Sequence, residues 1–266
     1  CPFSQDLFGE RLVQHLVSMG VTPLVPERVN APTALAVVSI ADDGQPSYAF
    51  YRNDTADRQL REPMITESIP EVVSAFHFGS LCLANTTDSQ VWLELALNLR
   101  QEDVLITLDP NLRPALIDSM NPYRERLGTA YELCDVLKFS DEDLSILYPD
   151  EPAFERLIQI QEQHQIPLVI LTKGVHGSAA RTLNGVVAEV PPFPIRTMGD
   201  TVGAGDTFQA AVVFWLTEHF EQPHRQAHTL EKDALTALLR FANTAAGLTC
   251  QERGCNPPTR EHVDAA

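Results

Sequence analysis

The sequence predicts an α/β protein: a mainly parallel sheet covered by helices, preceded by a small β-hairpin. Three observations lead to this fold class. The 266 residues, 44% of them hydrophobic, suffice for one large globular domain. From about residue 70 onward, short apolar segments alternate with amphipathic ones, which is typical of a parallel sheet with covering helices. Before that point, β-branched residues flank an Asp-Asp-Gly turn signal at 42–44, which predicts the hairpin.

The elements follow in order along the chain. Apolar residues at helical spacing over 12–17, followed by Gly20, predict a first helix that ends at a left-handed glycine. The segments 33–40 and 48–51 predict the two strands of the hairpin. Periodicity then predicts sheet strands at 75–78, 105–108, 136–139 and 168–171, and helices between them at 91–99 and 154–161.

Composition and charge exclude several classes of partner. Thirty-six acidic residues against nineteen basic ones give a formal net charge of -17, and no Lys/Arg run could follow a nucleic-acid backbone. No apolar stretch approaches the ~18 to 20 residues of a membrane helix, and the start does not resemble a signal peptide. The five scattered cysteines favour reduced thiols. We therefore expect a cytoplasmic protein that binds neither nucleic acid nor membrane.

The chemistry is expected beyond the carboxyl ends of the strands, where open α/β sheets bind their ligands. Polar loops follow all four predicted strands, at 79–80, 109–114, 140–143 and 172–174. A single polar residue after a strand is commonly only a helix cap, and for Ser140 alone the cap is the preferred interpretation. Four such loops together indicate a binding site.

The segment 199–208 carries the most specific signal, because a turn of small residues there opens an apolar helix. The amides around Gly203, Ala204 and Gly205 can point at one spot, where the helix dipole adds partial positive charge. This arrangement predicts an anion hole. Asp206 falls in the first helical turn, which places a carboxylate beside the anion. The alternative is that the glycines only ease helix packing and that Asp206 is a favourable N-terminal acid.

Other ligand motifs are absent from the sequence or weak. There is no Gly-x-x-x-x-Gly-Lys-Ser/Thr loop and no Gly-x-Gly-x-x-Gly after a strand, so a nucleotide would be held in another way. His224 and His228 have a spacing that could ligate a metal, but no third ligand lies nearby in the sequence. We interpret both histidines as solvated.

The motif Asp-Thr-Val-Gly-Ala-Gly-Asp at 200–206 resembles the signature of the ribokinase-like (PfkB) carbohydrate kinases. Further segments resemble the fructokinase branch in the same order, at 33–36, 48–53, 56–57, 76–80 and 109–114. The resemblance covers essentially the whole chain. It implies a ribokinase-like three-layer α/β/α sandwich, one domain over residues 1–266, with a lid hairpin at about 31–53. It also implies that this domain lacks the family's N-terminal strand, whose Asp binds sugar hydroxyls, and the Gly-Gly-x-x-x-Asn segment that follows that strand.

The resemblance implies an ATP-dependent sugar kinase that converts fructose to fructose 6-phosphate. Asp206 is the implied base that deprotonates the acceptor hydroxyl, while the amides of the glycine turn hold the charge of the transferring phosphoryl group. Asn111 and Arg113 are the implied substrate or phosphate ligands, although a surface salt bridge is an equal alternative for Arg113. The positions implied for ATP are Lys138, Ser140, Thr172, Gly174 and Asn243.

Two metal sites are implied as well. The family's Asn-x-x-Glu element, which organises Mg²⁺ and phosphate through water, corresponds to residues 140–143. Its last position is Asp143, one methylene shorter than the family's Glu. A monovalent-cation site, for K⁺, is implied at Asp200, the Val202 carbonyl, Thr249 and Gly254.

Two alternatives to a fructokinase stay open at this point. The 2-keto-3-deoxygluconate kinases carry a similar Asp-Pro-Asn-Leu-Arg-Pro loop, although residues 51–53 and 56–57 favour fructose. A non-catalytic sugar-binding or scaffold protein of the same fold is the other alternative, and the intact Gly205 and Asp206 weigh against it. Relatives pair their lids across a dimer, so the resemblance also implies a homodimer formed through the hairpin.

Overall fold

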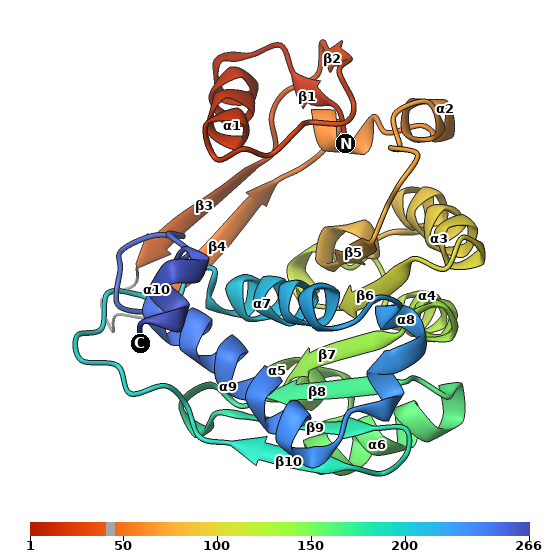
Figure 1. Cartoon of the computed structure of the whole chain (residues 1–266). Helices are drawn as coiled ribbons and strands as arrows, with labels where there is room; N and C mark the ends of the chain where they lie inside the picture. The colour runs from red at the N-terminus through yellow and green to blue at the C-terminus, as the bar shows by residue number, and fades with distance from the viewer. Residues whose placement is uncertain (41–45) are drawn as a thin grey trace.

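The body of the molecule is a six-stranded sheet with helices on both faces (Figure 1). The computed structural model describes residues 1–40 and 46–266, so the turn predicted at 42–44 lies outside the described residues. The strand order is β10-β9-β8-β7-β6-β5. The strands are β5 (Ala75–Gly79), β6 (Leu105–Asp109), β7 (Val136–Ser140), β8 (Leu168–Thr172), β9 (Ser178–Thr182) and β10 (Val187–Val190).

Strands β5 to β8 are parallel to one another, whereas β9 and β10 are antiparallel to their neighbours. The predicted mainly parallel sheet is therefore confirmed, and each of the four predicted strands continues for one further residue at its carboxyl end. Strands β9 and β10 have no counterpart among the predicted strands. The sequence of β9, Ser-Ala-Ala-Arg-Thr, lacks the apolar run that identifies a buried strand.

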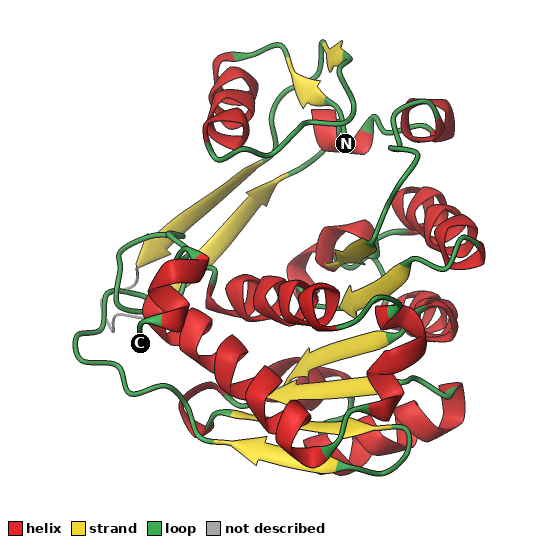
Figure 2. Cartoon of the chain, in the orientation of Figure 1, coloured by secondary structure: helices red, strands yellow, loops and turns green. Residues whose placement is uncertain are grey.

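The helices divide the core into two layers on opposite faces of the sheet (Figure 2). Leu137 and Phe139 of β7 are buried against the first group of helices, and Val136 of the same strand is buried against the second. This alternation is expected of a strand that is buried on both faces. The first group consists of α3 (Thr86–Gln101), α4 (Met120–Leu133), α5 (Asp141–Leu147) and α6 (Ala153–His164). The second consists of α7 (Ala204–His219) and α9 (Lys232–Thr249), followed by the short α10 (Arg260–Asp264); α8 (Pro223–Gln226) precedes α9.

The two predicted helices are confirmed by their buried faces. The segment 91–99 lies within α3, where Leu95, Ala96 and Leu99 are buried. The segment 154–161 lies within α6, where Leu157 is buried. The apolar spacing of both segments therefore marks the side that faces the sheet.

A separate hairpin extends obliquely between the body and the N-terminal elements (Figure 1). It consists of β3 (Leu35–Ile40) and β4 (Pro46–Tyr51), which pair antiparallel with Leu35 opposite Tyr51 and do not join the six-stranded sheet. The predicted hairpin is thus confirmed. The other elements before the sheet are β1 (Phe3–Ser4), α1 (Leu7–Ser18), β2 (Arg28–Val29) and α2 (Glu62–Thr66).

Helix α1 begins five residues before the first apolar position that predicted it. Its N-cap is Asp6, whose carboxylate accepts hydrogen bonds from the backbone N–H groups of Gly9 and Thr33, each at 2.8 Å. These N–H groups hold the pKa of Asp6 well below its usual range. One carboxylate therefore both starts the helix and attaches it to the segment that leads into the hairpin.

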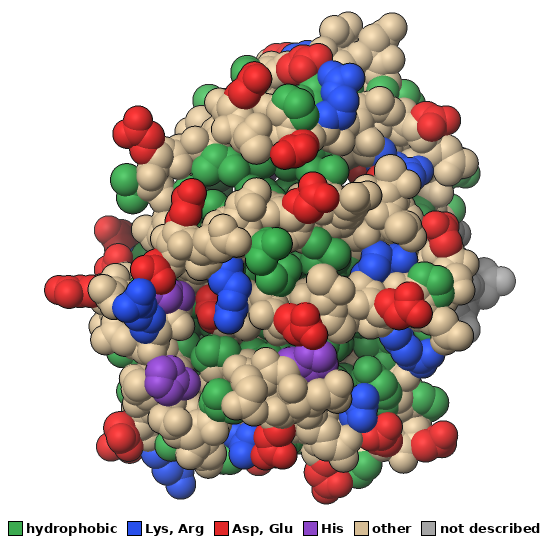
Figure 3. All heavy atoms as spheres, turned by 90° about the vertical axis from the view of Figure 1, so that its right-hand side faces the viewer, with side chains coloured by type: hydrophobic (Ala, Val, Ile, Leu, Met, Phe, Trp, Pro, Cys, Tyr) green, Lys and Arg blue, Asp and Glu red, His purple; other side chains and the backbone are tan. Residues whose placement is uncertain are grey.

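The surface carries dispersed charges. On the face shown in Figure 3, Lys and Arg side chains lie among acidic ones and form no continuous basic stripe. Within the described ranges, no helix combines the length and the apolar character needed to cross a membrane.

Candidate active site

The glycine turn forms the N-terminus of α7, as predicted. Gly203 is the N-cap and has a φ of 78°, a left-handed conformation that favours glycine. A Cβ atom at this position would lie 2.4 Å from Sγ of Cys255, so the turn also needs glycine for space. The amide of Ala204 donates to the carbonyl of Thr201. The next amides, those of Gly205 and Asp206, have no hydrogen-bond partner in the part of the chain that the structure describes, and N-terminal donors of this kind bind anions.

Asp206 is exposed at this helix N-terminus, and the loop after β6 reaches it at the carboxyl end of that strand. The Nδ2 atom of Asn111 lies 3.4 Å from Oδ1 of Asp206, although the two residues are 95 positions apart in the chain. The structure therefore brings together two of the predicted site residues. A carboxylate beside free helix N-terminal amides can accept a proton while those amides hold an anion.

Beneath this turn lies a buried ion pair. Nζ of Lys138 is 2.6 Å from Oδ2 of Asp109, and the two side chains are 4% and 3% exposed. A Cβ atom built on Gly205 would be 3.7 Å from the same Nζ, so the ammonium group lies directly below the start of α7. Within the described residues, the buried Oδ1 of Asp109 has no hydrogen-bond partner.

Sequence reasoning included Asp109 only as part of a polar loop and assigned it no role. Its signal was the acidic residue at the end of an otherwise apolar strand. Its partner Lys138 lies 29 residues away on the neighbouring strand β7, and no local pattern indicates that pairing.

The residues after β7 make a helix cap and a buried carboxylate. Ser140 is the N-cap of α5, and its Oγ accepts from the amide of Asp143 at 3.0 Å, which confirms the capping interpretation. The Asp143 side chain is buried, and its Oδ1 accepts from the amide of Leu112 at 3.0 Å. Burial raises the pKa of Asp143, and the neighbouring carboxylate of Asp109 acts in the same direction.

Among the described residues, Arg113 has no partner for the surface salt bridge that was one of its two interpretations. In the part of the chain that the structure describes, its hydrogen bonds go instead to its own loop. Nη1 donates to Oδ1 of Asn111 at 2.7 Å, to the Asn111 carbonyl at 3.2 Å and to the Leu112 carbonyl at 2.9 Å. A guanidinium bound in this way fixes the loop that approaches Asp206.

The positions implied for ATP lie at the ends of three strands: Ser140 at the end of β7, Thr172 at the end of β8, and Asn243 of α9 beside the residue that follows β10. Thr172 ends β8 and donates to the carbonyl of Phe139 at 3.4 Å, and Gly174 follows it, exposed and with a φ of 50°. Asn243 is buried on α9, and its Nδ2 donates to the carbonyl of Pro191 at 3.0 Å. The same NH₂ group also lies 3.4 Å from the carbonyl of Val190, so a nucleotide would compete with these two carbonyls for its hydrogens.

The implied monovalent-cation site is a junction of two loops. Oδ1 of Asp200 accepts from the amide of Val202 at 2.9 Å, and Oδ2 accepts from the amide of Gly254 at 2.6 Å. These donors lower the pKa of Asp200. The side chain of Thr249 faces a different partner, since its Oγ1 lies 3.1 Å from Oγ1 of Thr207 on α7. Each Asp200 oxygen accepts one amide hydrogen and keeps a second lone pair for a cation, and backbone carbonyls would supply most of the other ligands.

The histidines with metal-ligand spacing lie outside this region and do not form a site. His224 is not solvated as interpreted: it is half-buried, and its Nε2 lies 3.3 Å from Oδ1 of Asp103. No cluster of three or more His, Cys, Asp or Glu side chains that could hold a metal is found among the described residues.

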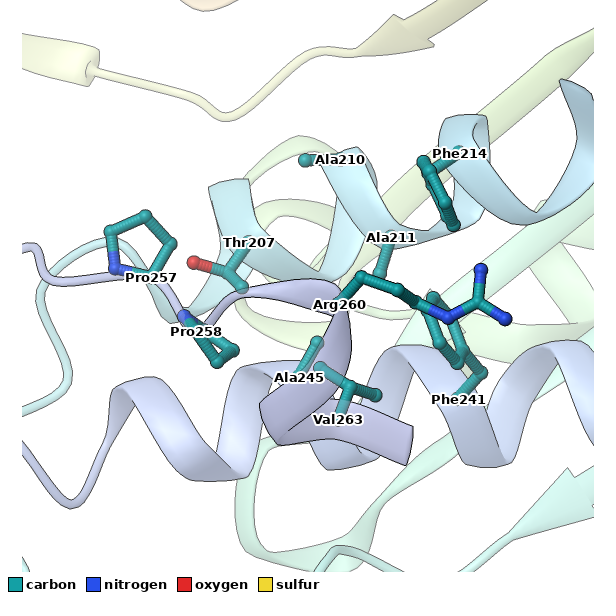
Figure 4. Close-up of a pocket in the computed structure, with 10 residues that line it drawn as sticks. All are labelled: Thr207, Ala210, Ala211, Phe214, Phe241, Ala245, Pro257, Pro258, Arg260 and Val263. Carbon is teal, nitrogen blue, oxygen red and sulfur yellow. The ribbon is translucent and has the colours of Figure 1, made fainter. Parts of the chain in front are cut away.

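A mostly apolar pocket lies between α7, α9 and the C-terminal segment (Figure 4). The guanidinium of Arg260 covers the rings of Phe214 and Phe241, at 5.1 and 5.4 Å from their centroids. None of the predicted site residues lines this pocket. The candidate site is therefore the N-terminus of α7 together with the loops after β6 and β7.

A parallel sheet whose carboxyl edge carries a helix N-terminus, a buried cation and a carboxylate is the arrangement expected of a phosphotransferase. The chain belongs to the pfkB family of carbohydrate kinases, whose sequence profile matches residues 2–262.

Individual relatives agree with this assignment. The chain is 29% identical over 239 residues to the probable fructokinase-6, chloroplastic, of Arabidopsis thaliana. The matched region covers 89% of this chain and 60% of that relative's length. The fructokinase of Xylella fastidiosa with bound ATP superimposes with a TM-score of 0.86 at 25% identity, covering 99% of this chain and 82% of that one. The Vibrio cholerae O395 fructokinase with fructose, ADP and calcium bound gives 0.83 at 25% identity, covering 99% and 83%. These neighbours confirm the predicted ribokinase-like α/β/α fold.

Proposed function

We propose that the protein transfers the γ-phosphoryl group of ATP to a hydroxyl of fructose and forms fructose 6-phosphate. The observation that carries this proposal is the position of Asp206 at the N-terminus of α7, with Asn111 beside its carboxylate. Two similar proteins support the choice of substrates, because one is a fructokinase with bound ATP and the other a fructokinase with fructose and ADP bound.

In this proposal the chain supplies positioning and charge. Asp206 accepts the proton of the acceptor hydroxyl, which makes the oxygen a better nucleophile. The amides of Gly205 and Asp206, with the ammonium of Lys138 below them, stabilise negative charge on the transferring group. The nucleotide lies along the loops that carry Ser140, Thr172 and Gly174, next to Asn243 on α9.

Mg²⁺ is part of the proposal as the companion of the nucleotide, where it would neutralise phosphate charge. The buried Oδ1 of Asp109, which has no partner among the described residues, and the carboxylate of Asp143 are oxygen donors that fit this ion through water. Within the described ranges neither residue belongs to a dense carboxylate cage, so phosphates and water would provide most of the ligands. We expect excess chelator to abolish turnover, and full activity in chelator would contradict a role for the ion.

K⁺ is proposed at the junction of Asp200 and Gly254, where backbone carbonyls would supply most of its ligands. Replacing K⁺ by choline at constant ionic strength tests this proposal. An unchanged rate would remove the ion from the mechanism.

The test of function is a sugar panel assayed for ADP formation with ATP and Mg²⁺. Fructose should give the highest kcat/KM, and a coupled assay should identify the product as fructose 6-phosphate. 2-Keto-3-deoxygluconate and ribose serve as the competing acceptors. Preferred turnover of the sugar acid would replace fructose as the substrate. Binding of ATP and sugar without turnover of any acceptor would support the non-catalytic alternative.

We also propose that the hairpin of β3 and β4 is a lid over the sugar. Its base is joined to the body by Arg52, whose guanidinium lies 2.7 Å from Asp57 and 3.2 Å from Asp88 at the start of α3. Closure would exclude water from the phosphoryl group and so limit ATP hydrolysis. Backbone amides of 33–40 and 46–52 should gain hydrogen-exchange protection when fructose binds. Unchanged protection with sugar bound would argue against a lid.

A homodimer through the lid is the proposed assembly. Leu12 and Val17 on α1, and Leu35 and Val37 on β3, are exposed apolar side chains near or on the hairpin. Sedimentation equilibrium should give twice the monomer mass, and Val37→Lys should give the monomer. A monomeric parent protein would contradict this assembly.

A cytoplasmic location completes the proposal, because the proposed donor is ATP and the five cysteines are free thiols.

A further inference from the structure

The loop after β6 holds one of its residues in an unusual backbone conformation. Asn111 has a φ of +40°, in the left-handed region that residues other than glycine rarely adopt, although Asn tolerates it better than most. Such a conformation persists only where surrounding contacts hold it in place. Two sets of contacts surround this residue.

The first set comes from Arg113. Its Nη1 carries two hydrogens and shares them among three acceptors: Oδ1 of Asn111 at 2.7 Å, the Asn111 carbonyl at 3.2 Å and the Leu112 carbonyl at 2.9 Å. A charged donor on the amide oxygen turns the NH₂ end of the Asn111 side chain the other way. The guanidinium therefore sets both the backbone and the side-chain orientation of Asn111.

The second set holds the loop from below. Oδ1 of the buried Asp143 accepts from the amide of Leu112 at 3.0 Å, which connects the loop to the first turn of α5. The loop is thus held between α5 and its own arginine. The remaining polar end of the Asn111 side chain, its NH₂ group, points away from both of these anchors.

That direction leads to the proposed base. Nδ2 of Asn111 lies 3.4 Å from Oδ1 of Asp206. This is longer than the usual ~2.7–3.2 Å, as is common for catalytic hydrogen bonds before substrate arrives. The NH₂ group contacts one carboxylate oxygen of Asp206, and the other oxygen can face the acceptor hydroxyl.

We propose that Arg113 is a positioning residue that acts through Asn111 to orient the carboxylate of Asp206. The inference rests on the proposed function, because it gives Asp206 the role of base. It differs from the substrate or phosphate contact expected for Arg113 from the resemblance. The guanidinium acts on the rate of proton transfer and not on the affinity for sugar or nucleotide.

The first test is a double-mutant cycle with Arg113→Met and Asn111→Ala. Arg113→Met should lower kcat by roughly tenfold to a hundredfold, the loss expected from a misplaced reacting group, with both KM values within about twofold. In the Asn111→Ala background, the same substitution should change kcat by less than about twofold, because the intermediary is already gone. Additive losses, or a large rise in either KM, would overturn the proposal in favour of direct contact with a substrate.

The second test is chemical rescue. Guanidinium ion, at concentrations that leave the protein folded, should restore part of the kcat of Arg113→Ala. It should restore nothing in Arg113→Ala combined with Asn111→Ala. Equal rescue in the two variants would show that the cation acts without Asn111 and would overturn the proposal.

A third readout needs no turnover and separates this inference from the proposed function. The side-chain NH₂ of Asn111 in ¹H–¹⁵N spectra should exchange slowly and should shift in both Arg113→Met and Asp206→Asn. A protein that lacks kinase activity but shows these shifts would contradict the proposed function and keep the contact. An NH₂ group that is unaffected by Arg113→Met would overturn the inference even in an active enzyme.

Discussion

The ammonium group of Lys138 lies 2.6 Å from the carboxylate of Asp109, and this buried pair lies directly below the first turn of α7. The two residues end or nearly end neighbouring strands, so the pair forms only because β6 and β7 are adjacent. It places a fixed positive charge beneath a helix N-terminus that already attracts anions.

Removing one member of this pair should be much more harmful than removing both. Lys138→Met leaves a buried carboxylate without its cation, which costs about 3–5 kcal/mol of unfolding free energy. Adding Asp109→Leu should recover most of that loss. Urea unfolding of the two single variants and the double variant measures both effects, and additive losses would contradict this account. If Lys138 also serves phosphate, the double variant should regain stability but not turnover.

Asp206→Asn should remove the proton acceptor and keep the size of the side chain. We expect kcat to fall by ~10² to 10⁴-fold, the usual contribution of a general base, with nucleotide affinity nearly unchanged. The matched control is Asp233→Asn, which removes an exposed acid from the first turn of α9. Both substitutions should cost only about 0.3–1 kcal/mol through the helix dipole. Near-normal turnover in Asp206→Asn would reduce this residue to a helix-start acid.

Gly203→Ala should damage both stability and catalysis. The left-handed φ of 78° costs a non-glycine residue roughly 1–2 kcal/mol, and the new Cβ would press on Cys255. Gly185→Ala is the matched control, because Gly185 has a φ of 88° and open space around it. Both variants should lose stability in thermal unfolding, Gly203→Ala more because of the contact with Cys255, but only Gly203→Ala should lose turnover. Normal turnover in Gly203→Ala would contradict the anion hole.

Asp135→Asn should change how stability depends on pH. Burial raises the pKa of Asp135 to about 6, so between about pH 4 and 6 the folded protein keeps a proton that the unfolded chain has released. Stability from this group therefore falls as pH rises through that window, by up to about 3 kcal/mol. The Asn side chain can still accept from the amide of Ile106, which now bonds Asp135 at 2.8 Å.

The variant should consequently gain stability relative to the parent as the pH rises from 4 to 7. Urea unfolding at both pH values measures this difference. Arg100, whose Nη1 lies 3.5 Å from Oδ1 of Asp135, keeps its hydrogen bond to the carbonyl of Leu133 in the variant. We therefore expect no large loss of stability at pH 7 from the missing ion pair. A difference that is constant with pH would contradict the raised pKa.

The elements that were predictable have signals within a few adjacent residues. The apolar runs at 105–108 and 168–171 identify buried strands, because a strand covered on both faces excludes polar side chains. The turn at Gly203 and the acid at Asp206 are likewise local, since small residues directly before an apolar run predict a helix N-terminus, where backbone amides attract anions. Strand β9 was not predictable, because Ala and Ser are buried there only by pairing with β8 and β10.

The sequence by itself determined the fold class, the sheet strands 75–78 to 168–171 and the helix N-terminus with Asp206, because backbone conformation and apolar periodicity are properties of short segments. Tertiary structure alone decided which charged groups meet. The order of the strands sets Lys138 against Asp109, and the approach of α7 to the β6 loop sets Asn111 against Asp206. These contacts join residues that are 29 and 95 positions apart in the chain. Helical or strand periodicity relates only residues a few positions apart, so it cannot predict such contacts. Only the packed sheet brings them within hydrogen-bonding distance.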